Sequence, residues 1–328
     1  MKYRVLGKTG FKVSEVSLGT WQLGGKWGTG FADEKAEEIL KTALDNGINF
    51  IDTADVYKAG KSENAVGSFV RQADKKVFVA TKCGRRLDPH RAEDYTPDNL
   101  KKFVEDSLKN TGFKTLDLIQ IHCPPTEIYY RPEIFAMFDR LKDQGKIRNL
   151  GVSVEKVEEG IKAIEYPNVT TVQIIYNMFR QRPAELFFEE ASSRNVGIIV
   201  RVPLASGLLT GKFDQSTTFN KEDHRNFNRQ GEAFDKGETF AGVDYETGLK
   251  AVEELKKVFP EYDNLAPVAI KWVLMNQNVS CVIPGASKVE HVKSNILASE
   301  MDPIPQTRMD RIDEIYKKYI KDSVHHLW

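Results

Sequence analysis

Three ionisable residues each stand at the end of a short apolar run of the sequence. Asp52 ends NFID, Lys82 ends VFVATK and His122 ends LDLIQIH. If these runs are parallel strands, their carboxyl ends share one rim, and spacings of about 30 to 40 residues suit a strand, a returning helix and two loops. Tyr57 follows Asp52 on the next loop. We therefore expect an acid, a lysine, a histidine and a tyrosine to meet at the mouth of a barrel.

These four side chains suit the delivery of a proton to a substrate. A tyrosine with an ordinary pKa near 10 exchanges protons poorly at neutral pH unless a neighbour changes that pKa. The Lys82 ammonium beside the phenol would stabilise phenolate, and Asp52 can keep the lysine charged. His122 can hydrogen-bond a carbonyl oxygen or relay a proton. Carbonyl reduction needs such a donor, because the oxygen gains negative charge as hydride arrives.

A purely structural interpretation also exists for each residue. Asp52 and Lys82 can be an ion pair between adjacent strands that Tyr57 merely covers. Complementary groups at three consecutive strand ends nevertheless favour function.

The composition argues against several function classes. Lysine plus arginine and aspartate plus glutamate number 47 each, so no global basic field exists for nucleic acid or an anionic membrane. No apolar run approaches the roughly 18 residues of a membrane span, and the N-terminus does not resemble a signal peptide. We expect a cytoplasmic protein without a membrane partner, and its oligomeric state stays open. Cys83, Cys123 and Cys281 are widely spaced and lack a CxxC pair, which argues against a disulfide framework and a zinc site.

Strand-like runs alternate with helical patterns along the whole chain. The expected strands are residues 15–18, 49–52, 77–82, 116–122, 150–153, 171–176, 197–203 and 280–284. The expected helices include 33–46, 63–72, 97–110, 132–144, 157–164, 183–194, 245–259, 266–275 and 309–320. A doubly wound sheet would also alternate, but nothing here divides the chain into halves. The pattern predicts an α/β fold, a (β/α)8 TIM barrel that occupies residues 1–328 as one domain.

Residues 205–244 break this rhythm after the seventh strand. The segment is polar and longer than an ordinary loop between a strand and a helix, which is typical of a lid or of disorder. The chain closes on His325, His326 and Trp328, where we expect a frayed tail.

Several strings resemble those of the aldo-keto reductases, in the same order and over nearly the full length. They are GTW (19–21), DTADVY (52–57), ATKCG (80–84), LDLIQIHCPP (116–125), GKIRNLGVS (145–153), QIIYN (173–177), PLASGLLTGKF (203–213) and IPGASKVEHVKSN (283–295). The chain resembles a bacterial branch of that family that is similar to the potassium-channel β subunits. The resemblance implies a barrel that binds NADPH at its mouth without a Rossmann domain, in agreement with the missing GxGxxG. It also implies a catalytic tetrad of Asp52, Tyr57, Lys82 and His122, with Tyr57 as the proton donor.

The same resemblance implies three groups of cofactor-binding residues. Those expected near the nicotinamide are Gly19, Thr20, Trp21, Ser153, Gln173, Asn177 and Arg201. The loop expected to wrap the pyrophosphate contributes Pro203, Leu204, Ser206, Gly207, Leu209, Gly211 and Lys212, unless it is a plain surface turn. The adenosine end is expected at Gly285, Ala286, Ser287, Lys288, His291 and Asn295. Ser287 and Lys288 can bind a 2′-phosphate at a helix N-terminus, which favours NADPH over NADH, or they can form only a solvated cap.

Arg201 departs from the family pattern, because many relatives place a stacking aromatic residue there. A guanidinium can stack through its plane. Its positive charge beside the ring would favour reduced cofactor and thus reduction, but Arg201 can equally form a salt bridge inside the mouth.

The sequence thus predicts an NADPH-dependent enzyme that reduces aldehyde, ketone or sugar carbonyls. The alternative is a cofactor-sensing binding subunit with slow turnover, and an isomerase or lyase would need carboxylates with a metal at the mouth. Aromatic walls for the substrate, or ordinary rim packing, are expected at Trp21, Trp27, Tyr57, Tyr129, Tyr130, Phe227 and Phe234, together with Arg225.

Overall fold

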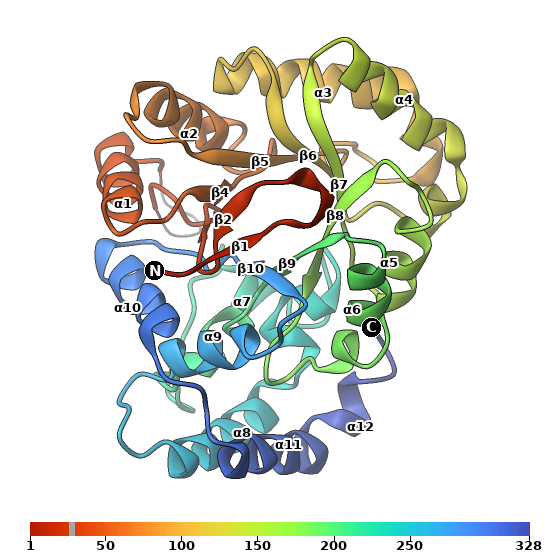
Figure 1. Cartoon of the computed structure of the whole chain (residues 1–328). Helices are drawn as coiled ribbons and strands as arrows, with labels where there is room; N and C mark the ends of the chain where they lie inside the picture. Colours follow the sequence, from red (N-terminus) through yellow and green to blue (C-terminus); the bar gives the residue numbers. More distant parts are fainter. Residues whose placement is uncertain (26–29) are drawn as a thin grey trace.

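Eight parallel strands form the centre of the molecule, and helices surround them (Figure 1). The computed structural model describes residues 1–25 and 30–328. The barrel strands are β3 (Leu18–Gly19), β4 (Phe50–Asp52), β5 (Phe78–Cys83), β6 (Leu116–His122), β7 (Ile147–Ser153), β8 (Val169–Ile175), β9 (Gly197–Arg201) and β10 (Val279–Val282). Each strand pairs with the next along the chain, and bridges from Val16 to Val282 and from Gly19 to Gly285 join the first strand to the last. The predicted (β/α)8 barrel is confirmed.

The helices lie outside the strands, close to the expected ranges. The barrel helices are α1 (Asp33–Asp45), α2 (Lys61–Gln72), α3 (Pro97–Thr111), α4 (Pro132–Asp143), α5 (Val157–Ala163), α6 (Phe187–Ser193), α9 (Ala266–Leu274) and α10 (Val289–Glu300). Additional helices are α8 (Tyr245–Val258), α11 (Gln306–Tyr319) and α12 (Lys321–Val324), and α8 packs against α11 beside the barrel (Figure 1).

Helix α3 illustrates why these boundaries can be anticipated. The Thr96 hydroxyl accepts a hydrogen bond from the Asn99 amide (3.2 Å), and Pro97 fills the first helical position. Gly112 then ends the helix with a left-handed φ of 67°. Both end signals are local chemistry, so the sequence carries them directly.

A two-stranded hairpin closes one end of the barrel, and no expectation from the sequence covered it. Its strands, β1 (Tyr3–Val5) and β2 (Lys12–Ser14), pair antiparallel and cross the barrel (Figure 1, dark red). Leu6 and Val13 from this hairpin are fully buried. They pack against inward-facing strand residues that include Phe50, Phe78, Ala80, Leu118, Ile199 and Cys281.

The two-residue period of the strands places polar residues above that apolar layer. Lys82 shares the inward face of β5 with Phe78, and His122 shares that of β6 with Leu118. Asp52 follows Phe50 in the same way on β4. The barrel interior is therefore apolar near the hairpin and polar at the carboxyl ends of the strands.

The long segment 205–244 is ordered and lies against the mouth. It contains η5 (Ala205–Thr210), α7 (His224–Phe227), η6 (Lys236–Glu238) and η7 (Phe240–Gly242). The ring of His224 lies 5.1 Å from that of Trp21, and Glu238 pairs with Arg85. We call residues 205–244 the mouth loop.

The chain end does not fray, so that expectation was wrong. Trp328 is only 5 % exposed and donates its indole N–H to Asp235 of the mouth loop (2.8 Å). Burial of the aromatic ring and the hydrogen bond of its N–H both hold the Trp328 side chain in place. Separately, no helix in the described part of the chain is long and apolar enough to cross a membrane.

Candidate active site

The predicted tetrad converges at the polar end of the barrel. The Lys82 ammonium pairs with Asp52 from the neighbouring strand. It also donates to the Thr53 carbonyl (2.9 Å) and to the Tyr57 hydroxyl (3.3 Å). The ring of His122 lies edge-on to that of Tyr57, with centroids 6.1 Å apart. Asp52, Lys82 and His122 are buried, whereas Tyr57 is only partly buried, so the phenol is the member that a substrate can reach.

Two glutamines hold the Asp52 carboxylate on its other oxygen. Gln120 Nε2 lies 3.0 Å from Asp52 Oδ2, and Gln173 Nε2 lies 2.8 Å from the same atom. Gln173 was expected near the nicotinamide, but its amide here supports Asp52. Gln120 was not predicted, although it stands two residues before His122 and so shares its inward face. Together with Lys82, these donors satisfy a carboxylate that would otherwise be costly to bury.

The surroundings determine which of these groups carry a proton. Burial raises the pKa of Tyr57 above its ordinary value, although the Lys82 ammonium opposes that effect. Burial alone would lower the pKa of Lys82, but Asp52 and Tyr57 raise it. Burial, reinforced by Arg85 and Lys82, lowers the pKa of His122 well below its ordinary value. At neutral pH the site therefore holds a protonated phenol, an ammonium and a neutral imidazole.

Aromatic rings cover the tetrad on the side of the mouth loop. Trp21 stacks beside Tyr57 at 6.2 Å and lies 6.2 Å from Phe234. His224 approaches Trp21 at 5.1 Å, and Phe227 contacts Phe234 at 6.2 Å. The fold therefore brings together four of the side chains predicted to form the walls of the substrate pocket, namely Trp21, Tyr57, Phe227 and Phe234. His224 joins them and was not predicted.

Other predicted walls lie elsewhere. Tyr129 is fully buried, so it offers no surface to a substrate. Tyr130 is 65 % exposed, and its ring contacts Lys162 instead of the site. Arg225 pairs with Asp223 of its own loop (2.6 Å). Trp27 lies outside the described residues.

Arg201 forms an ion pair inside the mouth, the second of the two arrangements expected for it. Its Nη2 lies 2.8 Å from Glu155 Oε2, and its Nη1 lies 3.9 Å from Glu238 Oε1. Arg85, just after β5, also contacts Glu238 Oε1, at 2.8 Å. We call Arg85, Arg201, Glu155 and Glu238 the ion cluster. Sequence reasoning missed three of its members, because no spacing rule links Arg85 to a carboxylate in the mouth loop.

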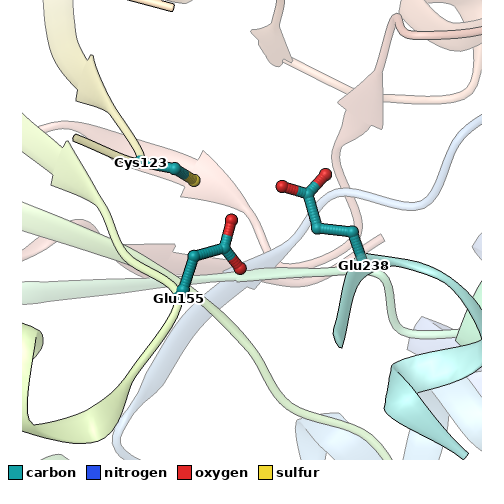
Figure 2. A group of neighbouring side chains, drawn as sticks. All are labelled: Cys123, Glu155 and Glu238. Atoms are coloured by element: carbon teal, nitrogen blue, oxygen red, sulfur yellow. The ribbon is translucent and has the colours of Figure 1, made fainter. Parts of the chain in front are cut away.

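The two carboxylates of the ion cluster face each other near Cys123 (Figure 2). Burial raises the pKa of Glu155 to about 8, and neighbouring Glu238 adds to this although Arg201 opposes it. Burial would also raise the pKa of Glu238, but Arg85 and Arg201 outweigh it and hold that pKa below its ordinary value. One proton between the two carboxylates removes most of their repulsion.

A metal ion is a poor match for these three side chains despite their proximity. One donor atom from each of Cys123, Glu155 and Glu238 lies within 4.8 Å of the others. Both glutamate side chains, however, already accept hydrogen bonds from arginines, and burial raises the pKa of the Cys123 thiol well above its ordinary value. A cation would have to displace two guanidiniums and a thiol proton.

The residues expected near the nicotinamide gather around the tetrad. The Thr20 hydroxyl donates to the Asp52 carbonyl (3.0 Å), and Gly19 bridges to Gly285. Ser153 ends β7, with its hydroxyl 3.4 Å from Cys123 Sγ. Asn177 donates to the carbonyl of Val202 (2.9 Å). Ser153 pairs with His122 across β6 and β7, and Gly19 pairs with Asp52 across β3 and β4.

The segment expected to wrap a pyrophosphate forms a tight turn. Ser206 and Gly207 have left-handed backbones, with φ values of 55° and 101°. The Ser206 hydroxyl donates to the Glu238 carbonyl (3.1 Å), and Lys212 is exposed at the end of the turn. Leu209 is fully buried, so its side chain belongs to the core. Pro203 is also buried, whereas Leu204 and Gly211 are partly exposed.

The expected adenosine end lies at the start of α10. A side chain added at Gly285 would meet its nearest neighbour, the Gly19 carbonyl, only at 4.0 Å. Asn295 Nδ2 lies 3.5 Å from the Gly285 carbonyl, and the Ser287 amide donates to His291 (3.4 Å). Ala286 is buried and Lys288 is exposed.

These groups fit a dinucleotide by their chemistry. Free ammonium groups and backbone amides at a helix N-terminus suit phosphates, and the Gly19 to Gly285 bridge places this end beside the tetrad. Two of the predicted cofactor residues, Leu209 and Ala286, bury their side chains in apolar core clusters, whereas Gln173 turns toward Asp52 and Arg201 toward Glu155.

Comparison with known proteins agrees with this geometry. The model of the aldo/keto reductase family matches residues 15–317. The structure of the glycerol dehydrogenase AKR11B4 from Gluconobacter oxydans is similar, with a TM-score of 0.79 and 31% identity over 97% of this chain and 96% of that one. The holo form of aldo-keto reductase AKR11C1 from Bacillus halodurans gives a TM-score of 0.77 and 26% identity, over 96% of each chain.

The chain is also similar to a protein whose name describes a channel subunit instead of an enzyme. A probable voltage-gated potassium channel subunit beta from Arabidopsis thaliana is 26% identical over 332 residues, covering 96% of each protein. The expected relation to that branch is thereby confirmed. The chain belongs to the aldo/keto reductase family.

Proposed function

We propose that this protein is an NADPH-dependent reductase of aldehyde, ketone or sugar carbonyls in which Tyr57 donates the proton. The observation that carries the proposal is the position of the Lys82 ammonium, which contacts both Asp52 and the Tyr57 hydroxyl. His122 lies edge-on to the same phenol. An acid held next to a fixed cation is what a carbonyl needs when its oxygen becomes negative.

The residues of the chain have separate tasks in this reaction. Bound NADPH would supply the hydride, with its two electrons, to the carbonyl carbon. Neutral His122 can donate a hydrogen bond to the carbonyl oxygen and so orient it. Tyr57 then gives its proton to that oxygen, which yields the alcohol. The Lys82 ammonium, 3.3 Å from the phenol oxygen, stabilises the phenolate until solvent returns a proton.

Residues at the start of α10 support the choice of NADPH. Ser287 and the exposed Lys288 lie where the helix presents its N-terminal amides. A 2′-phosphate would gain a hydroxyl, backbone donors and an ammonium there. NADH, which lacks that phosphate, would gain none of them.

The test is an assay of NADPH and NADH oxidation with a panel of aldehydes, ketones and aldoses. We compare the native protein with Tyr57→Phe and with Tyr130→Phe, which removes an exposed phenol whose ring contacts Lys162. Tyr57→Phe should lower turnover by about 10² to 10⁴ while cofactor affinity stays the same, and Tyr130→Phe should change neither. Cofactor binding without turnover of any carbonyl would instead support a cofactor-sensing subunit, and no cofactor binding would reject both.

A further inference from the structure

Two arginines from the barrel hold one carboxylate that comes from outside the barrel. Arg85 Nη1 lies 2.8 Å from Glu238 Oε1, and Arg201 Nη1 lies 3.9 Å from the same atom. Arg85 stands just after β5 and Arg201 ends β9, whereas Glu238 belongs to the mouth loop. The side chain of Arg85 remains 20% exposed. The mouth thus contains a preformed place for a carboxylate.

That place adjoins the reacting group. Donor atoms of Glu238 and Cys123 lie within 4.8 Å of each other, and Cys123 directly follows His122 in the chain. Among the charges near His122, the guanidinium of Arg85 has the largest influence on its pKa, which it lowers. A carboxylate bound by Arg85 would therefore lie close to a carbonyl bound at His122.

If the mouth loop moved away, Arg201 would keep a carboxylate partner, but Arg85 would lose its own. Arg201 would keep Glu155, which stands just after β7 and lies 2.8 Å away. Arg85, in contrast, pairs with no carboxylate other than Glu238 within residues 1–25 and 30–328. A largely buried guanidinium without a partner is costly. An anion from solution would therefore compensate for the withdrawal of Glu238.

We propose that Arg85 recognises a carboxylate on the substrate, which takes the place of Glu238, so that the enzyme prefers oxo-carboxylates to neutral carbonyl compounds. The inference rests on the proposed reduction reaction and names its substrate class. A planar carboxylate is the group that the site already accommodates, and guanidinium binds that group with directed hydrogen bonds.

The kinetic test compares two aldehydes of equal chain length, butanal and 4-oxobutanoate, at saturating NADPH. Arg85→Gln should raise the KM for 4-oxobutanoate by roughly 10- to 100-fold, the range for lost hydrogen bonds to a charged group. The KM for butanal, which has no carboxylate, should change much less, and the affinity for NADPH should not change. Arg91→Gln, which removes an exposed arginine of the same loop, should affect neither substrate. Equal effects of Arg85→Gln on both aldehydes would overturn the proposal.

A second variant tests the competition by the mouth loop. Glu238→Gln removes the internal carboxylate, so the KM for 4-oxobutanoate should fall while that for butanal stays the same. An unchanged or higher KM for 4-oxobutanoate would contradict substitution of one carboxylate for the other. If Arg85→Gln fails to fold, Arg85→Lys keeps the charge but loses the planar fork, and a selective rise in the KM for 4-oxobutanoate is still expected.

Binding separates failure of this inference from failure of the proposed function. If NADPH binds but neither these two aldehydes nor any carbonyl of the panel is reduced, the proposed function fails. Titration of the NADPH complex with succinate then tests whether Arg85 forms a carboxylate-binding site. Binding that Arg85→Gln abolishes and Arg91→Gln preserves would support a carboxylate site, whereas no binding, or binding indifferent to Arg85, would overturn it.

Discussion

The indole N–H of Trp328 donates a hydrogen bond to Asp235, 2.8 Å away, and so joins the end of the described chain to the mouth loop. The Trp328 ring also lies 4.1 Å from the guanidinium of Arg180. Asp235 caps the short helix η6 by accepting a hydrogen bond from the Gly237 amide (2.7 Å). That helix contains Glu238, so this contact helps to place a carboxylate beside Arg85.

We expect Trp328→Ala to loosen the mouth loop. The change removes a large buried side chain, so the free energy of unfolding should fall by about 3 kcal/mol, and proteolysis within residues 223–244 should become faster. Trp328→Phe keeps a ring but loses the N–H, and should cost only about 1 kcal/mol. Denaturant unfolding and limited proteolysis measure both effects. Identical behaviour of the two variants would show that the hydrogen bond and the ring size do not matter.

Gly67 permits the close packing of α2 on α3, and an alanine there should destabilise the fold. A side chain added at Gly67 would lie 2.1 Å from the Thr111 carbonyl oxygen, which is backbone and cannot move aside. We expect Gly67→Ala to lower the free energy of unfolding by about 2–3 kcal/mol. Gly30→Ala is the control, because an added side chain there meets no atom of the described residues within 4 Å. Equal stability of both variants in denaturant unfolding would contradict this account.

The parts that could be predicted from sequence are those that depend on local pattern. Asp52, Lys82 and His122 were found because strand ends in a parallel barrel share a rim, and α3 because Thr96 and Gly112 mark its ends. Gln120 could have been found by the same two-residue period that identified His122. The hairpin was missed because strands as short as β1 and β2 show too little alternation to stand out.

The ion cluster and the fixed chain end could not be predicted, for a different reason. Arg85 and Glu238 are separated by 153 positions, and Trp328 and Asp235 by 93. Such contacts depend on the path of the mouth loop across the barrel. No local preference of either partner encodes that path.

Glu155 should make stability depend on pH in a definite direction. Its pKa is about 8 in the folded protein and about 4.3 when unfolded, so between these values the folded state keeps a proton that the unfolded state has lost. The contribution to stability is complete below about pH 4.3 and disappears as the pH rises toward about 8, by at most about 1.4 kcal/mol per pH unit.

Glu155→Gln should remove this dependence. Between about pH 5 and 8 the native protein should lose more unfolding free energy than the variant does, as measured by denaturant titration at several pH values. Glu190→Gln, at a half-exposed glutamate that pairs with Arg194, should follow the native curve. Parallel curves for the native protein and Glu155→Gln would mean that Glu155 does not hold the proton.

Cofactor preference should depend on Lys288, which lies exposed at the start of α10. Lys288→Met removes the ammonium that we assign to the 2′-phosphate, so the Kd for NADPH should rise roughly tenfold, the effect of one charge-assisted contact. The Kd for NADH should stay the same, because NADH has no phosphate at that position. Lys293→Met, at another exposed lysine of the same helix, should leave both constants unchanged. An equal loss of affinity for both cofactors in fluorescence titrations would place the role of Lys288 elsewhere, since only the phosphate distinguishes the two ligands.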